Sequence, residues 1–448
     1  MKNAFNFKVV IAISAISTLY ACTQDAVDGL LMQTETEQNT TNLLPKHRTY
    51  EEALSIAQSA IEMLGENYTT RSGEARSINT SDVQCIINNS STRSAEALDT
   101  LMYVFNFTDN AGFAVISANR ATEELIAVTE QGHYAVDEET ENEGFNIYMD
   151  MAKNYIGNTV AEMNYGPDVL LDYKREIVYD TLSYGPYLDV RWGQQWPYNI
   201  YCFTSAGQQA RSGCVATALA QIMTFYEYPS SLTIDYTESP FLQELHWDDI
   251  KLHYLSRDTV ESDCLYCFFS TITPTETHKE IGKLLRQLGH LLNSDYGTGE
   301  TGAHGENVAS VLQRLGYNFS EYQAYKDSIV QRSLSTKALV YMQGVRTDGK
   351  KGHAWVVDGH RRITKTTTEY IKPEGSELWE IMYESYDIYN YNHINWGWDG
   401  TCNGYFSSGV YQANRGTEYD AGVNTNLANN YPIQLMVQPN IRKPLSLF

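Results

Sequence analysis

Residues 212–223 read SGCVATALAQIM, and this stretch decides how the second half of the chain folds. Its apolar residues recur at helical spacing, so it predicts a helix that ends before Pro229. Cys214 then falls at the start of that helix, just after Gly213, which allows close backbone approach. Unpaired N–H groups and the positive end of the helix dipole favour a thiolate at this position. A reactive cysteine and a buried structural cysteine both fit this local pattern.

A reactive thiol needs a base, and the sequence offers two histidines for that role. His353 opens the β-prone run GHAWVVDG (residues 352–359), and His393 lies within YNHINWGWDG (residues 391–400). Each also fits an ordinary turn histidine. Asn395 and Trp396 supply a third role, because an amide can accept an imidazole N–H and an indole can shield that bond from water. The order Cys214, His353, Asn395 matches papain-like spacing.

A glutamine upstream of the cysteine supplies a fourth element. Gln194 lies within WGQQWPYN (residues 192–199). Its side-chain N–H can join the backbone N–H of Cys214 in an oxyanion hole, which stabilises the charge that develops during acyl transfer. Each of these features is a weak signal alone, but all four follow one order along the chain.

The composition excludes several other classes of function. Among 448 residues, Asp and Glu outnumber Lys and Arg by 55 to 32, for a formal net charge of −23. Such a charge opposes binding to a phosphate backbone, so no nucleic-acid partner is expected. Because 42% of the residues are hydrophobic and 12% aromatic, most of the chain is expected to fold around a sizeable core.

The N-terminus predicts export. Lys2 and Lys8 precede a short apolar run, which is typical of a signal peptide over residues 1–21. Cys22 follows a small residue at the expected cleavage point, as in the lipobox of bacterial lipoproteins, so we expect lipid attachment at Cys22. An ordinary cleaved signal is the alternative. Residues 22–46 are polar without an apolar period and are expected to be a flexible tether to the membrane, on its periplasmic side or at the cell surface.

The seven cysteines do not predict the disulfide framework of a small secreted domain. If one is lipidated and another is a working thiol, an odd number remains. Cys264 and Cys267 form an isolated C-x-x-C pair, whereas a zinc site needs a second pair at suitable spacing. We expect two cysteines without a role, with a redox dithiol or local disulfide as the alternative. No metal and no organic cofactor is predicted.

The remaining patterning predicts an α+β protein. In residues 47–165, Thr49 and Glu52 form a capping box before a helical repeat, and the runs at 101–107 and 113–117 form a hairpin, which together predict a small α+β domain. Residues 166–185 are expected to be a linker that is open to proteolysis. Residues 186–448 combine a helical first half with an antiparallel β second half, an arrangement that leaves a cleft between them.

These motifs together resemble the streptopain family of cysteine peptidases. They are GCVATA at 213–218 with QIM at 221–223, GHA at 352–354 with DG at 358–359, NWGW at 395–398, and QxxPYN at 194–199. The resemblance covers about residues 185–440 and implies a papain-like two-lobed catalytic domain, with residues 47–165 as an inhibitory propeptide. It implies Cys214 as the nucleophile and His353 as the general acid/base. Asn395 and Trp396 would orient and shield His353, and Gln194 would donate to the oxyanion.

The resemblance also implies a substrate-binding surface. Gly352 would contact the substrate backbone, and residues 295–303 correspond to the family's flexible substrate loop, including Thr301 and Gly302. The family has a serine at the position of Gly302, and Glu300 adds a charge to the loop. The resemblance therefore implies the chemistry of the family but not its side-chain preference.

The expected function is a secreted, lipid-anchored zymogen of a cysteine endopeptidase, which hydrolyses peptide bonds through a Cys–His dyad and an acyl-enzyme. Its partners would be protein or peptide substrates and its own propeptide, an intramolecular inhibitor released by a cut within residues 166–185. Two alternatives remain. One is a catalytically inactive papain-like binding module on the cell surface. The other is a glycan-binding surface lipoprotein, indicated only by the anchor and by 33 Tyr and 7 Trp.

Overall fold

The computed structural model describes residues 33–37, 47–64, 75–87, 100–136, 140–159, 172–257, 273–345, 352–372, 377–412 and 435–444. The predicted signal peptide, Cys22, Cys264 and Cys267 lie outside these ranges. No helix within them is long and apolar enough to cross a membrane. Mixed helices and antiparallel sheet confirm the predicted α+β class.

The helical half is centred on α3 (Cys214–Tyr226), which packs against α4 (Trp247–Arg257) and α6 (Glu276–Leu291). The helix predicted to begin at Cys214 and to end before Pro229 is confirmed. It begins after Gly213, whose φ of 94° suits glycine, and it ends at Glu227 in a left-handed conformation before Pro229. Leu219 and Ile222 on α3 and Leu284 on α6 are buried in the core of this half.

The β half follows as one antiparallel sheet. Its central strands are β12 (Leu339–Val345), β13 (Gly352–Lys372), β14 (Glu380–Asn395) and β15 (Gly404–Ser407), with β16 (Met436–Ile441) and β11 (Gln323–Ala324) beyond β12. The smaller elements of the second domain are β7 (Ser231–Ile234), β8 (Phe241–Glu244), β9 (Asp295–Tyr296), β10 (Thr301–Gly302), α7 (Asn307–Arg314) and α8 (Asp327–Leu334).

The N-terminal domain has the predicted elements. Helix α1 (Tyr50–Glu62) begins with the capping box of Thr49 and Glu52. The predicted hairpin is β3 (Thr100–Phe107) and β4 (Phe113–Ser117), flanked by β2 (Ile78–Ile87) and β5 (Leu125–Thr129). Helix α2 (Glu143–Asn158) follows, capped by Asn142.

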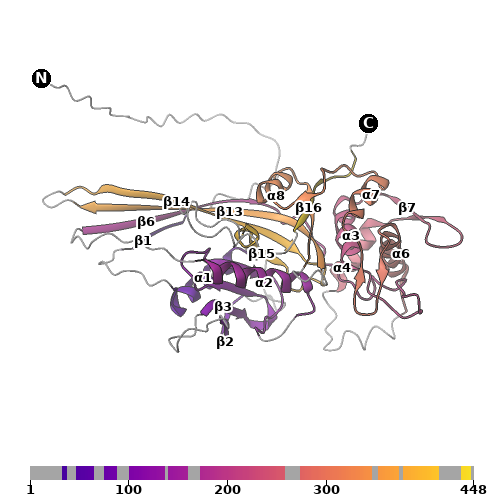
Figure 1. The fold of residues 1–448 in the computed structure, drawn as a ribbon, viewed down its shortest axis with the longest axis horizontal. Coiled ribbons are helices and arrows are strands. Elements are labelled where there is room, and N and C mark those ends of the chain that lie inside the picture. Colours follow the sequence, from indigo (N-terminus) through magenta and orange to yellow (C-terminus); the bar gives the residue numbers. More distant parts are fainter. Residues whose placement is uncertain are drawn as a thin grey trace, which may run out of the picture.

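The two halves of the chain share a single sheet. Strand β5 of the N-terminal domain pairs with β15 of the second domain, so that β2–β5 continue the strand order β11-β16-β12-β13-β14-β15. Their cores also merge, because Phe145 and Tyr148 of α2 pack in the same cluster as Trp355, Trp396 and Phe406. Figure 1 shows α1 and α2 against this extended sheet, with α3, α4 and α6 gathered at one end.

The linker predicted over 166–185 is largely a strand. Residues 172–184 form β6 (Asp172–Tyr184), which pairs with β13 from His360 to Lys372, beyond the point where β12 ends. With β14 on the other edge of β13, these strands run out from the body as an arm (Figure 1). Within the predicted tether, residues 33–37 form β1 (Gln33–Glu37), which pairs with β6. Local composition did not reveal these strands, because their pairing partner lies far away in the sequence.

Candidate active site

Cys214 is the first residue of α3, as predicted. Burial raises the pKa of its thiol, while the backbone groups of Ala354, Val215 and Cys214 itself act in the opposite direction. The contact with Ala354 shows that the sulfur lies against the first turn of its helix and the start of β13. At neutral pH the partly buried group is therefore a thiol rather than a thiolate.

His353 lies beside Ala354 on β13 but presents its ring to the other face of the sheet. Ala354 and Val356 belong to the core under α3, whereas Trp355 and Val357 belong to the core under α2. Side chains alternate along a strand, so His353 shares the α2 face with Trp355, and their rings stack at 6.2 Å. No hydrogen bond joins Cys214 and His353 in the described structure.

The imidazole of His353 is held by a backbone carbonyl. Its Nε2 donates to the carbonyl oxygen of Trp396 at 2.7 Å, and the residue is 5% exposed. Burial lowers the pKa of His353 to about 4, with the Trp396 carbonyl acting in the opposite direction. A neutral imidazole and a neutral thiol on opposite faces of a strand do not form the ion pair that activates a cysteine nucleophile.

Within the described residues, no hydrogen bond joins Asn395 to His353, contrary to the predicted geometry. Its side-chain amide donates to the carbonyl of Val190 at 2.7 Å and accepts from the N–H of Gly397 at 3.2 Å. The neighbouring carbonyl of Trp396 takes the place predicted for the amide. The indole of Trp396 is fully buried and donates to the carbonyl of Cys402 at 3.0 Å.

Gln194 has the property expected of an oxyanion donor. The residue is 5% exposed, and its Nε2 has no hydrogen-bond partner within the described residues. Its backbone carbonyl accepts from the N–H of Ser212 at 3.0 Å, which ties it to the segment that leads into Cys214. A buried donor without a partner costs stability, and this one belongs to a residue tied to the segment that leads into Cys214.

The predicted substrate-binding residues divide into two groups. Gly302 and Gly352 are exposed, and a Cβ built on Gly302 meets nothing within 4 Å. Thr301 is instead buried, and its hydroxyl donates to the carbonyl of Arg211 at 2.7 Å. In this structure Thr301 therefore holds the segment that precedes Cys214, rather than facing a substrate.

The N-terminus of α2 covers His353. A Cβ built on Gly144 would lie 2.5 Å from Cδ2 of His353 and 2.5 Å from Cε3 of Trp396, so only glycine fits there. Asn142 caps the helix by accepting from the N–H of Phe145 at 3.1 Å and also donates to the carbonyl of Thr401 at 3.3 Å. This contact was not found from the sequence, because a glycine in the first turn of a helix carries no long-range signal.

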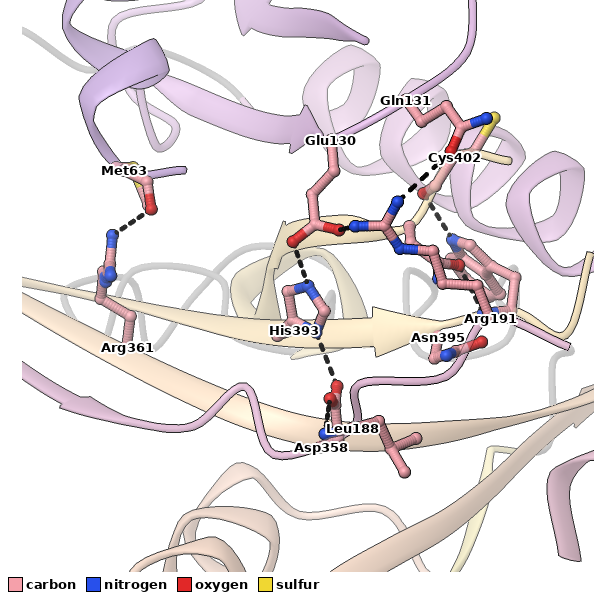
Figure 2. A network of polar contacts seen from close by, with 12 residues as sticks. Met63, Glu130, Gln131, Leu188, Arg191, Asp358, Arg361, His393, Asn395 and Cys402 are labelled. Carbon is pink, nitrogen blue, oxygen red and sulfur yellow. Dashed lines mark hydrogen bonds and ion pairs between the residues drawn. The ribbon is translucent and has the colours of Figure 1, made fainter. Parts of the chain in front are cut away.

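A buried ionic network joins the N-terminal domain to the second domain (Figure 2). Glu130, just after β5, accepts from Nε2 of His393 at 3.1 Å and from Arg191 at 3.2 Å. Nδ1 of His393 donates to Asp358 at 2.6 Å, and Asp358 also accepts from the N–H of Leu188 at 2.9 Å. Both ring nitrogens of His393 face carboxylates, so the ring is a charged imidazolium. The second candidate histidine is therefore part of the interface between the domains.

This network predicts a stability difference that depends on pH. Burial alone would lower the pKa of His393, but Asp358 and then Glu130 outweigh it and raise the value from 6.5 to about 10. A raised pKa stabilises the fold fully below about pH 6.5, and this contribution is lost as the pH rises through 10. In a Cys214→Ala background, Glu130→Gln is expected to lower the melting temperature at pH 7 by about 5 °C, because breaking a buried ion pair costs about 3–5 kcal/mol.

The melting temperatures of the Cys214→Ala parent and of its Glu130→Gln variant should become more similar between pH 7 and 10.5, because His393 becomes neutral in the parent. Glu52→Gln is the matched control, because its ion-pair partner Arg120 stays charged throughout this range. Scanning calorimetry at several pH values measures both differences. A gap for Glu130→Gln that stays constant up to pH 10.5 would show that His393 is not the charged partner.

Within the described ranges, no group of three His, Cys, Asp or Glu side chains could hold a metal ion. The four described cysteines, Cys85, Cys202, Cys214 and Cys402, are free.

Comparison with known proteins places the two domains. Residues 192–406 match the Peptidase C10 family, and residues 43–156 match the Spi protease inhibitor. The chain is 26% identical to streptopain of Streptococcus pyogenes serotype M28 over 333 residues, which cover 68% of this chain and 73% of that protein. It is 24% identical to the thiol protease/hemagglutinin PrtT of Porphyromonas gingivalis over 378 residues, which cover 78% of this chain and 38% of that protein.

A solved fragment of Prevotella intermedia prointerpain A aligns with 81% of this chain and 100% of its own length, at 23% identity and a TM-score of 0.48. The two family matches cover the N-terminal domain and most of the second domain described above. The second domain is therefore similar over residues 192–406 to the streptopain-type C10 cysteine peptidases, and the domain in front of it is similar over residues 43–156 to a Spi-type inhibitor.

Proposed function

We propose that this chain is the latent form of a cysteine endopeptidase in which Cys214 is the nucleophile and His353 the general acid and base. One observation carries the proposal: the inhibitor helix α2 lies directly on His353, where a Cβ on Gly144 would clash with the ring. Helix α2 buries His353, and the next residue of the same strand, Ala354, contacts Cys214. We infer that the inhibitor domain keeps the side chains of His353 and Cys214 apart.

In the proposed reaction, His353 takes the proton of the Cys214 thiol, and the sulfur attacks the carbonyl carbon of the scissile peptide. The oxyanion accepts hydrogen bonds from Nε2 of Gln194 and the backbone N–H of Cys214. His353 then protonates the leaving amine as the C–N bond breaks, which leaves a thioester. Water, deprotonated by His353, attacks the thioester, and Cys214 leaves as a thiolate that regains the proton.

Activation in this scheme requires His353 to change partners. Loss of α2 would expose the ring to solvent, which removes the burial that holds its pKa near 4. The imidazole could then leave the Trp396 carbonyl and turn toward Cys214, with the amide of Asn395 as its new acceptor and the indole of Trp396 as the shield. Gly302 and Gly352, both exposed, would line the path of the substrate backbone.

The proposal extends to location and partners. A signal peptide over residues 1–21 and lipid on Cys22 would place the zymogen on the outer side of a membrane, with protein or peptide substrates. Because the lipid and the peptidase domain lie on opposite sides of the predicted activation cut, the cut would release the peptidase domain from its anchor. Recovery of active peptidase domain still joined to lipidated Cys22 would contradict this.

The activation cut is expected on the N-terminal side of Asp172, and not within residues 172–184, which make up most of the predicted 166–185 linker. Residues 172–184 are paired with β13 along their whole length, and a peptidase must unpair a strand before it can bind it. The mature enzyme is therefore expected to keep β6. N-terminal sequencing of the processed form checks this, and a mature N-terminus after Tyr184 would contradict it.

The experiment that tests the proposed function follows purified residues 23–448 under reducing conditions by intact mass, beside Cys214→Ala. Inhibitors of serine and metallopeptidases are present throughout. The parent is expected to shorten and to begin to cleave casein as it does so, whereas Cys214→Ala stays whole. If limited trypsin removes the inhibitor domain and the parent still cleaves no protein, the peptidase fold serves as a binding module instead.

A further inference from the structure

The inhibitor domain makes a second contact beside the candidate dyad, through a charge. Glu141, next to the N-cap of α2, forms an ion pair with Arg211 at 3.3 Å. Arg211 lies only three positions before Cys214. The inhibitor domain therefore presents a carboxylate to the segment that leads into the nucleophile.

Arg211 is fixed by the peptidase domain itself. Its carbonyl accepts from the hydroxyl of Thr301 at 2.7 Å, and its guanidinium lies 4.8 Å from the centre of the Trp398 ring. Stacking on an indole leaves the N–H edges of a guanidinium free to bind a planar anion. Neither contact involves the inhibitor domain, so both remain when that domain leaves.

The indole of Trp398 connects Arg211 to the reacting groups. The ring of His353 stacks on the same indole at 6.1 Å. The guanidinium of Arg211 and the imidazole of the candidate general base, His353, therefore both lie against the indole of Trp398. The pair with Glu141 does not explain such a fixed position, because the side chain of Glu141 is 75% exposed and exposed pairs stabilise little.

We propose that Arg211 is a specificity-determining residue of the activated enzyme, which binds an aspartate or glutamate side chain of the substrate close to the scissile bond. Glu141 occupies the same position in the zymogen. This inference rests on the proposed function, because the acidic residue is placed relative to Cys214 and His353. Glu300, an acidic residue of the predicted substrate loop, acts electrostatically on Cys214, so the site has a negative as well as a positive charge.

The test compares cleavage of peptide pairs that differ by Asp against Asn, or Glu against Gln, within two residues of the cut bond. The activated parent, Arg211→Gln and Arg314→Gln are assayed in parallel, and mass spectrometry gives the cut positions. Arg314 is the matched control, because it is an exposed arginine of the same domain paired with Asp235. The parent and Arg314→Gln are expected to prefer the acidic peptide about tenfold in kcat/KM, and Arg211→Gln to lose the preference.

Each outcome bears on a different claim. If the parent cuts the neutral peptides but shows no preference for the acidic ones, or if Arg211→Gln keeps the preference, the assignment of Arg211 is overturned and the proposed function stands. If the activated parent cuts none of the peptides, the proposed function fails, and the assignment of Arg211 fails with it.

Discussion

Cys214→Ala is expected to lower kcat/KM for peptide hydrolysis by a factor of about 10⁴ or more. Without the sulfur no acyl-enzyme can form, and only the binding and oxyanion interactions remain to accelerate attack by water. The change removes one atom at the start of a helix, so the fold should be kept. The measurement uses parent and variant that have both been processed by limited trypsin, because the variant is not expected to process itself.

Cys202→Ala is the matched control for that experiment. Cys202 is a free, fully buried cysteine of the same domain, and burial raises the pKa of its thiol to about 12. The Cys202 thiol is expected to stay unreactive. An alkylating reagent should therefore label Cys214 in the processed parent and leave Cys202 unlabelled. Retention of a tenth or more of the activity in Cys214→Ala would rule out Cys214 as the nucleophile.

Gly144→Ala is expected to weaken latency, with the uncut chain becoming about ten times more reactive or more. The added methyl group would lie 2.5 Å from both His353 and Trp396, so α2 has to move away from them. Overpacking of this kind costs about 1–3 kcal/mol. The readout is the rate at which a small alkylating reagent labels Cys214, followed by intact mass so that cut and uncut chains are counted separately.

Gly157→Ala, near the other end of α2, isolates the effect of the clash. A Cβ there meets only Leu101, at 3.9 Å, which is an ordinary contact. Both substitutions favour the helix by up to about 1 kcal/mol, so helix propensity alone cannot separate them. Equal labelling rates in the two variants would mean that α2 does not control access to the site.

Local patterns predicted most of the elements. The capping box at Thr49, the hairpin of β3 and β4, and the helix that starts at Cys214 all depend on residues close together in sequence, and all three are present. The placing of Cys214 at a helix start and of His353 at a strand start also follows from sequence, whereas the contact between these two elements is seen only in the structure.

Long-range pairing could not be predicted in the same way. Residues 172–184 are a strand because β13 extends far enough to pair with them, and nothing within 166–185 specifies that partner. The geometry of Asn395 depends on the carbonyl of Val190, 205 positions away. The charge of His393 depends on Asp358, 35 positions away, and on Glu130, 263 positions away, and no short motif contains either pair.

The ladder between β5 and β15 has an evolutionary consequence. The same strand pairing that seats the inhibitor domain also completes the sheet and core of the peptidase domain. A substitution that weakens the pairing of β5 with β15 therefore also removes contacts on which folding of the peptidase domain depends. Substitutions in the β5–β15 pair are therefore expected to change the rate of activation and the yield of folded protein together, so selection acts on both properties at once.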